Sequence, residues 1–373
     1  MQSRRSSHGI RRAGLAVAGT LAVALATPGG AQFEKPYHIV DLAPGVFAVV
    51  WDEILEWPYE GNNLVIVNDE DVVVVDAKRT PSLAETVIRE IRARTEKPVR
   101  YLVNTHWHAD HTYANPVFRR AYPGLEIVGH PATVPAFSEI LQRSIDRTLA
   151  FASTAEQQLA SGRGDDGREL TAEERSALAA RWERTRTELL PLFRTVELVP
   201  PTLLVSDRLT LRRGEREIEI RFLGEANTRG DLVVYLPRER ILATGDLVVK
   251  PYPFLGLDDH PQSWVRVLDE LESFDVAVLL PGHGEVERDF TYVRRVKALF
   301  AALVAQVESL HASGAGLDEA QRRVDLAAEI AGVVPDDEKL RDELAAEWVP
   351  YAVELAWKHL PAAHGGGSAG DGR

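Results

Sequence analysis

The sequence predicts an α/β fold in which two strand-rich segments are separated by one helical segment and followed by another. Runs rich in β-branched residues dominate residues 39–103 and 203–280. Residues 132–192 are rich in Ala, Glu, Arg and Leu, and residues 290–360 repeat apolar side chains at helical spacing. Strands and helices that alternate along a chain favour stacked layers of sheets and helices.

In the first strand-rich segment each expected element has its own signal. The elements are two strands within residues 39–50, a hairpin of residues 63–67 and 72–76, a helix over residues 81–95 and a buried strand over residues 99–103. Pro44-Gly45 marks the first turn, and an Asn-Asp-Glu-Asp run marks the tip of the hairpin. The helix has apolar residues at helical spacing and Arg in its last turn.

The remaining segments complete the predicted organisation. Strands are expected at residues 203–211, 218–222, 232–236, 241–243 and 276–280. The helices of the central segment break near residues 161–164, where two Gly alternate with Ser and Arg. We predict a core domain over residues 32–289 with a helical insert at about 132–192, a C-terminal helical region over residues 290–360 and a Gly-rich disordered tail over residues 361–373.

Residues 1–31 have the order of features that is typical of a signal peptide. Four arginines and no acidic residue occupy the first twelve positions, an uncharged apolar run follows, and small residues end the segment at Ala31. The apolar run is shorter than the roughly 20 residues that a transmembrane helix needs. We therefore expect cleavage after Ala26 or Ala31 and an exported protein, periplasmic or secreted, without stable membrane insertion. An uncleaved anchor is the alternative, and Arg11-Arg12 leaves the general and twin-arginine export routes both open.

Composition and charge exclude several classes of function. The 373-residue chain has no Cys, so any metal site must use His and carboxylates rather than thiolates. A formal net charge of −13 argues against a nucleic-acid partner, because phosphate binding depends on clustered Lys and Arg. The partner that we expect is a small-molecule substrate. The apolar spacing in the helical segments fits core packing or a dimer surface, so the oligomeric state stays open.

The most informative stretch is NTHWHADH at residues 104–111, which follows the strand over residues 99–103. Three imidazoles and a carboxylate within six residues need partners, because such groups are costly to bury unpaired. His106 and His108 project from one side of an extended backbone, and Trp107 between them is expected to point into the core. Imidazole and carboxylate suit zinc and also iron or manganese. We therefore expect one or two metal ions per chain.

The string resembles the HxHxDH signature of the metallo-β-lactamase superfamily, and later segments follow in the order that this resemblance demands. Asp246 ends one strand pattern at the place of the bridging carboxylate, and His283 ends another at the place of the last His ligand. Asp76 resembles the Asp that braces the metal loop through hydrogen bonds. The resemblance covers roughly residues 39–286 and implies an αββα sandwich. The metal ligands that it implies are His106, His108, Asp110, His111, Asp246 and His283.

One position departs from the superfamily pattern. In the segment ANTRGD at residues 226–231, the superfamily has His where this chain has Asn227. The first metal site therefore keeps His106, His108 and Asp246 but lacks its third imidazole, whereas the second site is complete. A neutral amide is a poorer zinc ligand than imidazole, so we expect unequal occupancy of the two sites. The change also argues against the single-iron dioxygenase branch, which relies on that His.

The resemblance implies a hydrolase that uses a metal-bound hydroxide to cleave a small ester, lactone, thioester or amide, with β-lactam cleavage also open. Asp110 is expected to orient the attacking water and to take or relay its proton. If the first site is empty, Asn227 is expected to donate a hydrogen bond to the substrate instead. The candidates for the pocket wall are the loop aromatics Trp57, Tyr59, Tyr252 and Phe254. Two alternatives stay open: a non-catalytic binding protein with a degenerate metal site, and a phosphodiesterase-type hydrolase.

Overall fold

A computed structural model describes residues 37–52, 60–164 and 167–361 of the chain. The predicted signal peptide and the candidate wall residues Trp57 and Tyr59 lie outside the described residues and stay predictions. Among the described helices, none combines the length and the apolar character needed to cross a membrane.

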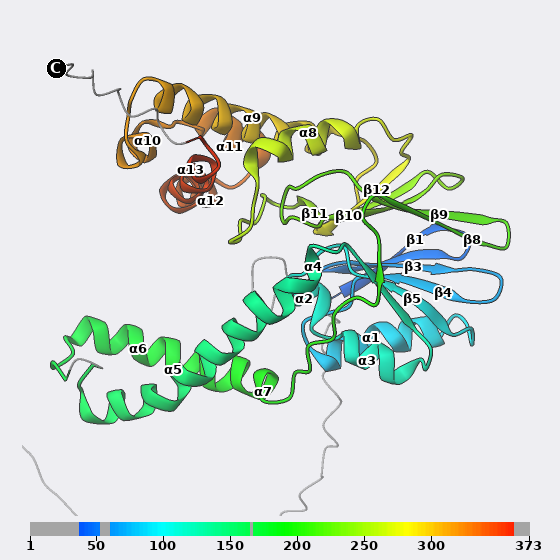
Figure 1. Ribbon diagram of the computed structural model, residues 1–373, viewed down its shortest axis with the longest axis horizontal. Coiled ribbons are helices and arrows are strands. Elements are labelled where there is room, and N and C mark those ends of the chain that lie inside the picture. Colours follow the sequence, from blue (N-terminus) through cyan, green and yellow to red (C-terminus); the bar gives the residue numbers. More distant parts are fainter. Residues whose placement is uncertain (1–36, 53–59, 165–166, 362–373) are drawn as a thin grey trace, which may run out of the picture. The chain divides into compact units, whose positions relative to one another are not determined.

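The described chain contains two stacked β-sheets with helices on both outer faces, which is the αββα sandwich that the sequence predicted (Figure 1). One sheet has the strand order β1 (Tyr37–Ala43), β2 (Val46–Trp51), β3 (Asn63–Val67), β4 (Val72–Val75), β5 (Val99–Val103), β6 (Glu126–Gly129) and β7 (Leu203–Leu204). The other sheet has the order β12 (Val278–His283), β11 (Ile241–Val249), β10 (Leu232–Leu236), β9 (Arg216–Phe222) and β8 (Arg208–Arg213).

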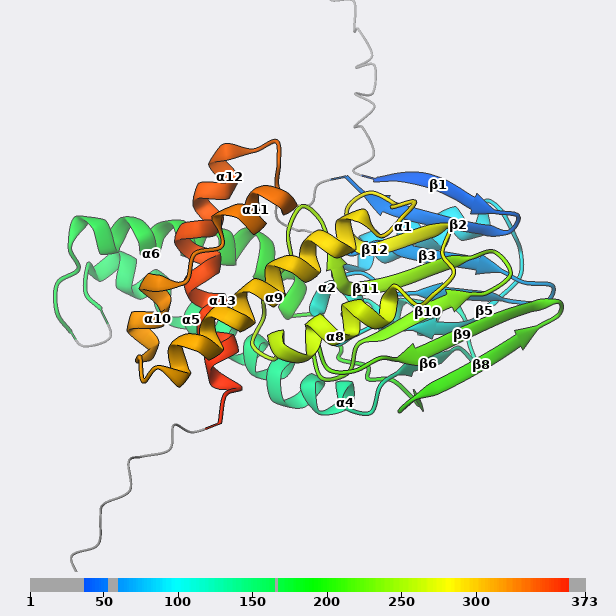
Figure 2. The ribbon, with the colours of Figure 1, turned by 90° about the horizontal axis from the view of Figure 1, so that it is seen from above.

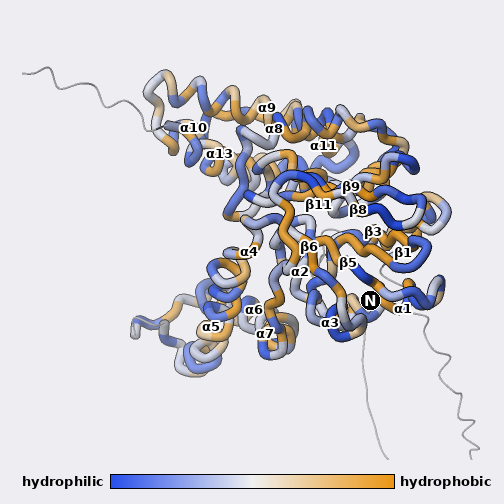
Figure 3. The backbone as a smooth tube through the Cα atoms, turned by 45° about the vertical axis from the view of Figure 1, so that its right-hand side comes forward, coloured by the Kyte–Doolittle hydropathy of each residue, from blue (hydrophilic) through white to orange (hydrophobic). Residues whose placement is uncertain are grey.

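Strand β2 illustrates why both faces of a sheet are covered. All of its residues are buried. Val46, Ala48 and Val50 pack in the core between the two sheets, whereas Phe47 and Val49 pack in the core beneath the helices. Alternate side chains of a strand point to opposite faces, so a strand that is apolar at every position needs a layer on each side. Figure 3 shows the hydrophobic colouring that follows along the inner strands.

The helices form the outer layers and two further groups. The first sheet is covered by α1 (Pro81–Arg92) and α3 (Asn115–Ala121), and the second by α8 (Pro261–Leu271) and α9 (Thr291–Ala312). Figure 2 shows α8 and α9 running over the strands of the second sheet. The remaining helices are α2 (Ala109–Thr112), α4 (Thr133–Ala136), α5 (Gln142–Ser161), α6 (Ala172–Arg184), α7 (Leu190–Phe193), α10 (Leu317–Arg323), α11 (Ala327–Val333), α12 (Glu338–Glu343) and α13 (Val349–Lys358). Single π-helical turns occur at Phe137–Leu141, Thr185–Leu189 and Leu344–Trp348.

Two details of the sequence interpretation need correction. Residues 203–211 were predicted as one strand, but β7 pairs in parallel with β6 while β8 pairs antiparallel with β9 in the other sheet. The chain crosses between the sheets at residues 205–207, and a β-like composition does not reveal which sheet a strand joins. Helix α8 was not predicted, although Trp264, Val267 and Leu271 follow helical spacing and are buried.

The sheet topology brings the chemically important loops to one edge. Strands β4 and β5 run in parallel, as do β11 and β12. The carboxyl ends of parallel strands lie at the same edge of a sheet, which is where ligands bind in open α/β sheets. Asp76 follows β4, the residues of the HxHxDH string follow β5, and His283 ends β12.

Candidate metal centre

Hydrogen bonds hold the loop after β5 in a defined shape. The Asn104 side chain donates from Nδ2 to the carbonyl oxygen of His111 at 3.1 Å and to Asn115 Oδ1 at 3.0 Å. Thr112 donates from Oγ1 to the carbonyl oxygen of His108 at 2.9 Å. These bonds turn the chain into the short helix α2, so that the polar side chains on both sides of the turn face the same space.

Two groups of buried side chains in this space could hold metal ions. His106, His111 and Asp246 offer ligand atoms that all lie within 4.8 Å of one another, and so do Asp110, His111 and His283. Asp246 lies between the groups, with Oδ2 3.6 Å from His106 Nε2 in the first and Oδ1 3.5 Å from His283 Nε2 in the second. This is the arrangement expected of a bridging carboxylate.

His108 lies beside these groups without joining either of them. Its ring centroid is 4.5 Å from that of His106, and it lines the pocket described below. Trp107 packs with Tyr113 and Phe137 in a separate apolar cluster, as the sequence predicted, and it also lines that pocket.

The residues present fit a divalent cation. Four buried atoms that face the groups have no hydrogen-bond partner among the described residues: His106 Nε2, His111 Nε2, His283 Nε2 and Asp246 Oδ1. Buried polar atoms without partners are rare in folded proteins. Three imidazole nitrogens and a carboxylate oxygen are also a donor set that suits zinc and related metals.

The electrostatics of the groups agree with this fit. Burial alone would lower the pKa of His283, but the carboxylates of Asp246 and Asp110 outweigh it and raise that pKa to about 9. Burial would raise the pKa of Asp246, yet His111 and His283 hold it well below its usual value. Protons on His111 and His283, whose pKa values are both raised, thus balance the carboxylates. A bound cation would replace these protons, so metal binding should release protons to solvent.

Asp76 orients one of the imidazoles. Its Oδ2 accepts a hydrogen bond from His111 Nδ1 at 2.8 Å, and its Oδ1 accepts one from the Thr105 backbone N–H at 2.8 Å. The first bond leaves Nε2 of His111 facing both groups. Asp76 adopts a φ of 62°, a left-handed conformation that Asp tolerates better than most residues. The bracing role implied by the resemblance is therefore matched by the contacts.

The sequence interpretation missed two buried charged residues near the groups. Arg79 Nη2 lies 3.3 Å from Asp110 Oδ1, and its backbone N–H donates to Glu60 Oε2 at 2.9 Å. Asp259 is fully buried, and burial together with the nearby carboxylates of Asp231 and Asp246 raises its pKa well above the usual value. Neither residue belongs to a recognisable motif, so only the tertiary structure reveals them.

Asn227 is buried with 1% of its surface exposed, and neither amide atom has a hydrogen-bond partner among the described residues. The loop around it is held by Asp231, whose two carboxylate oxygens accept hydrogen bonds from the backbone N–H and the hydroxyl of Thr228 at 2.8 and 2.9 Å. The start of β10 donates from the Leu232 N–H to the Thr105 carbonyl oxygen at 2.8 Å, so this loop adjoins the HxHxDH string.

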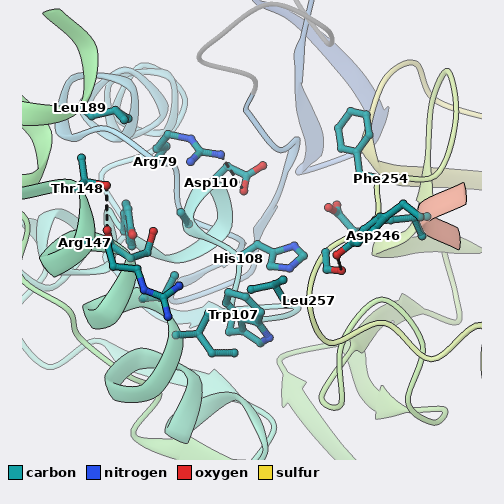
Figure 4. Close-up of a pocket in the computed structure, with 18 of the residues that line it drawn as sticks. Arg79, Trp107, His108, Asp110, Arg147, Thr148, Leu189, Asp246, Phe254 and Leu257 are labelled. Carbon is teal, nitrogen blue, oxygen red and sulfur yellow. Dashed lines mark hydrogen bonds and ion pairs between the residues drawn. The ribbon is translucent and has the colours of Figure 1, made fainter. Parts of the chain in front are cut away.

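A pocket of about 1110 Å³ opens onto the groups (Figure 4). Its lining includes His108, Asp110 and Asp246 from the candidate centre. Tyr252 and Phe254 also line it, and the Phe254 ring lies 5.2 Å from the His283 ring. Further lining residues come from the helical segment between β6 and β7 and from the C-terminal helices, among them Ile140, Arg147, Leu189, Phe193, Leu344 and Trp348.

Comparison with known proteins agrees with the geometry. Residues 57–283 match the family model of the metallo-β-lactamase superfamily. A linear primary-alkylsulfatase from Pseudomonas sp. is 25% identical over 279 residues, which cover 71% of this chain and 50% of the relative. The chain thus spans about half the length of the curated relative that it matches.

Solved structures share the fold. The inverting sec-alkylsulfatase Pisa1 from Pseudomonas sp. aligns with a TM-score of 0.55 and 16% identity, covering 86% of this chain and 50% of that one. A double mutant of the same enzyme aligns with a TM-score of 0.57 and 18% identity over the same shares of the two chains. At these identities the likeness shows the fold alone.

Proposed function

This chain belongs to the metallo-β-lactamase superfamily, whose members are metallo-hydrolases, and from that premise we propose that it hydrolyses the ester bond of a small molecule with a long apolar portion. The observation that carries the proposal is the pocket. Ligand pockets are commonly apolar with a few polar groups at the reacting end, and about 300–1,000 Å³ is typical of them. At about 1110 Å³, this pocket has room for a long chain whose scissile bond lies at Asp110 and Asp246.

The residues that would hold the metal are His106, His108, Asp110, His111, Asp246 and His283, and zinc is the proposed ion. When bound, a divalent metal supplies Lewis acidity, which lowers the pKa of water towards neutrality and polarises the scissile group. The chain's residues do the rest of the work. Burial lowers the pKa of His108 to about 4, so its imidazole is neutral at physiological pH and keeps a free lone pair.

Asp110 is the proposed proton acceptor. Its Oδ1 faces Arg79, and its Oδ2 lies 3.2 Å from His283 Nε2. Arg79 thereby fixes the carboxylate so that Oδ2 points into the reacting space. Burial would raise the pKa of Asp110, but His111 and Arg79 hold it well below its usual value, which keeps the group ionised. An ionised, oriented carboxylate can take a proton from water at Oδ2.

Two ester classes are candidates for the scissile bond. A carboxylic ester, lactone or thioester follows from the sequence interpretation. A sulfate ester is favoured by the relative, which is a linear primary-alkylsulfatase by name. An apolar chain in the pocket is compatible with both.

The experiment that tests the function compares matched substrates before and after metal removal. We expect the full mature chain to hydrolyse para-nitrophenyl esters from acetate to dodecanoate, or alkyl sulfates from butyl to dodecyl, with kcat/KM rising with chain length. Chelation should remove the activity and zinc should restore it. Turnover of bis(para-nitrophenyl) phosphate alone would favour the phosphodiesterase alternative. A zinc-loaded protein without turnover on any of the three would contradict the proposal.

Leu257 offers a test of the apolar chain's position. It lines the pocket and is 64% exposed, so Leu257→Ser should not disturb folding. We expect the variant to raise KM for a long-chain ester about tenfold, or about 1.4 kcal/mol, which is just below the ~1.5–3 kcal/mol assigned to a fully buried Leu side chain. KM for the acetate should stay unchanged. Leu204→Ser is the matched control, because Leu204 is 48% exposed and lies outside the pocket lining. Equal KM values for the long-chain ester in both variants would show that the substrate's apolar chain does not contact Leu257.

A further inference from the structure

The first metal site that the resemblance implies, with His106, His108 and Asp246, lacks its third imidazole. Asn227 stands where the superfamily has its third His, and both of its buried amide atoms have no partner among the described residues. A neutral amide adds no charge to the site. A further group with a buried, unpartnered polar atom would therefore have to lie near Asn227 for this side of the site to be complete.

A neighbouring loop brings such a group. The His260 backbone N–H donates to the carbonyl oxygen of Ala226 at 2.7 Å, so the loop before α8 lies against the loop that carries Asn227. The same loop touches the HxHxDH string at Gly256. A Cβ atom built on Gly256 would lie 3.2 Å from His108 Nε2 and 3.7 Å from Asp259 Oδ2. The Asp259 carboxylate is therefore on the His108 side of the loop.

The carboxylate of Asp259 is only half satisfied. Its Oδ2 accepts a hydrogen bond from the Gly256 N–H, whereas its buried Oδ1 has no partner in the described part of the chain. No ion pair with Asp259 is formed by any described residue. The other three acids of these loops are occupied. Asp258 pairs with Arg229 at 3.0 Å, Glu225 with His260 at 3.4 Å, and Asp231 bonds to Thr228. A buried carboxylate without a partner is strongly unfavourable unless it takes up a proton or a cation accompanies it.

We propose that Asp259 is an anionic ligand of the first metal site, together with His106, His108 and Asp246. This inference rests on one part of the proposed function, namely that the site binds a metal ion, and not on the substrate proposed above. The metal ion would be the partner that Oδ1 lacks, and the carboxylate would give the first site a negative charge that an amide could not supply.

The test is a zinc titration of the chelator-stripped full chain, with zinc per chain measured by elemental analysis. We expect wild type to bind two equivalents. Asp259→Asn keeps the bond to the Gly256 N–H but removes the charge, and it should weaken the second equivalent at least about tenfold. Asp258→Asn makes the same change one residue away and should bind as wild type does. Asn227→His restores an imidazole, so Asn227→His combined with Asp259→Asn should regain the lost equivalent.

Several results would overturn the inference. Wild-type stoichiometry and affinity in Asp259→Asn would do so, whether wild type binds one equivalent or two. Equal weakening of zinc binding in Asp259→Asn and Asp258→Asn would show that the net charge of the loop causes the effect, and not ligation by Asp259. An inactive protein whose zinc binding still depends on Asp259 would contradict the proposed function alone, whereas a wild type that binds no zinc would contradict both.

Discussion

We expect the Asp246→Asn variant to bind less metal than wild type and to hydrolyse its substrate more than about 100-fold more slowly. Loss of a residue that only orients a metal ligand already costs about 10–100-fold, and Asp246 would bind the metal itself. Asp246 Oδ1 lies 3.3 Å from His111 Nε2 and 3.5 Å from His283 Nε2, and Oδ2 lies 3.6 Å from His106 Nε2. An amide fills the same volume but carries no charge, and its N–H₂ would face an imidazole. Both groups therefore lose their shared anion. Zinc per chain and kcat/KM measure the effect.

The control for this variant is Glu285→Gln. Glu285 is close to His283 in the sequence, yet 62% of its side chain is exposed. The variant therefore loses the same charge as Asp246→Asn, but at a position outside the metal centre. We expect wild-type metal content and rate. A thermal unfolding midpoint close to that of wild type in both variants would show that the loss of metal comes from the missing ligand and not from unfolding. If Asp246→Asn keeps its zinc and its rate, the carboxylate does not bridge the two groups.

The metal-binding segments could be predicted because each is short, continuous and placed directly after a strand pattern. Strand β5 has the predicted bounds, Val99–Val103, and the polar string follows it without a gap. In such a segment the alternation of the backbone is enough to place His106 and Trp107 on opposite sides. Contacts within the loop add detail, such as the Asn104 bonds, but do not change which side chains meet.

The pocket could not be predicted because its walls come from distant parts of the chain. Ile140 and Phe193 precede β7, Trp348 belongs to the C-terminal helices, and all three line the cavity that reaches Asp246. Local periodicity identifies a helix and its apolar face, but it does not say which face meets which. Asp259 escaped notice for the same reason, since an acidic residue in a loop is usually solvated and only burial makes this one unusual.

Gly282→Ala is the second large effect that we expect. The substitution should lower the free energy of unfolding by about 3 kcal/mol, at the upper end of the range for overpacked cores, and should abolish tight metal binding. A Cβ atom on Gly282 would overlap Asp246 Oδ1 and lie 2.7 Å from the Gly245 carbonyl carbon and 2.9 Å from the Asp246 nitrogen. Two of these neighbours are backbone atoms of β11, which cannot rotate away as a flexible side chain can. Denaturant unfolding and zinc titration measure the two effects.

Gly332→Ala is the matched control, because a Cβ on this glycine of α11 meets nothing within 4 Å. Here we expect the free energy of unfolding to rise by about 0.5–1 kcal/mol, since Ala favours a helix interior over Gly. Opposite changes in the free energy of unfolding in the two variants would show that position 282 needs glycine for the close approach of its neighbours and not for backbone flexibility. Gly282 adjoins His283, and its missing Cβ lets β12 approach β11 closely enough for that imidazole to reach Asp246 Oδ1 at 3.5 Å. If Gly282→Ala matches wild type in stability and zinc affinity, this close approach does not determine the geometry of the centre.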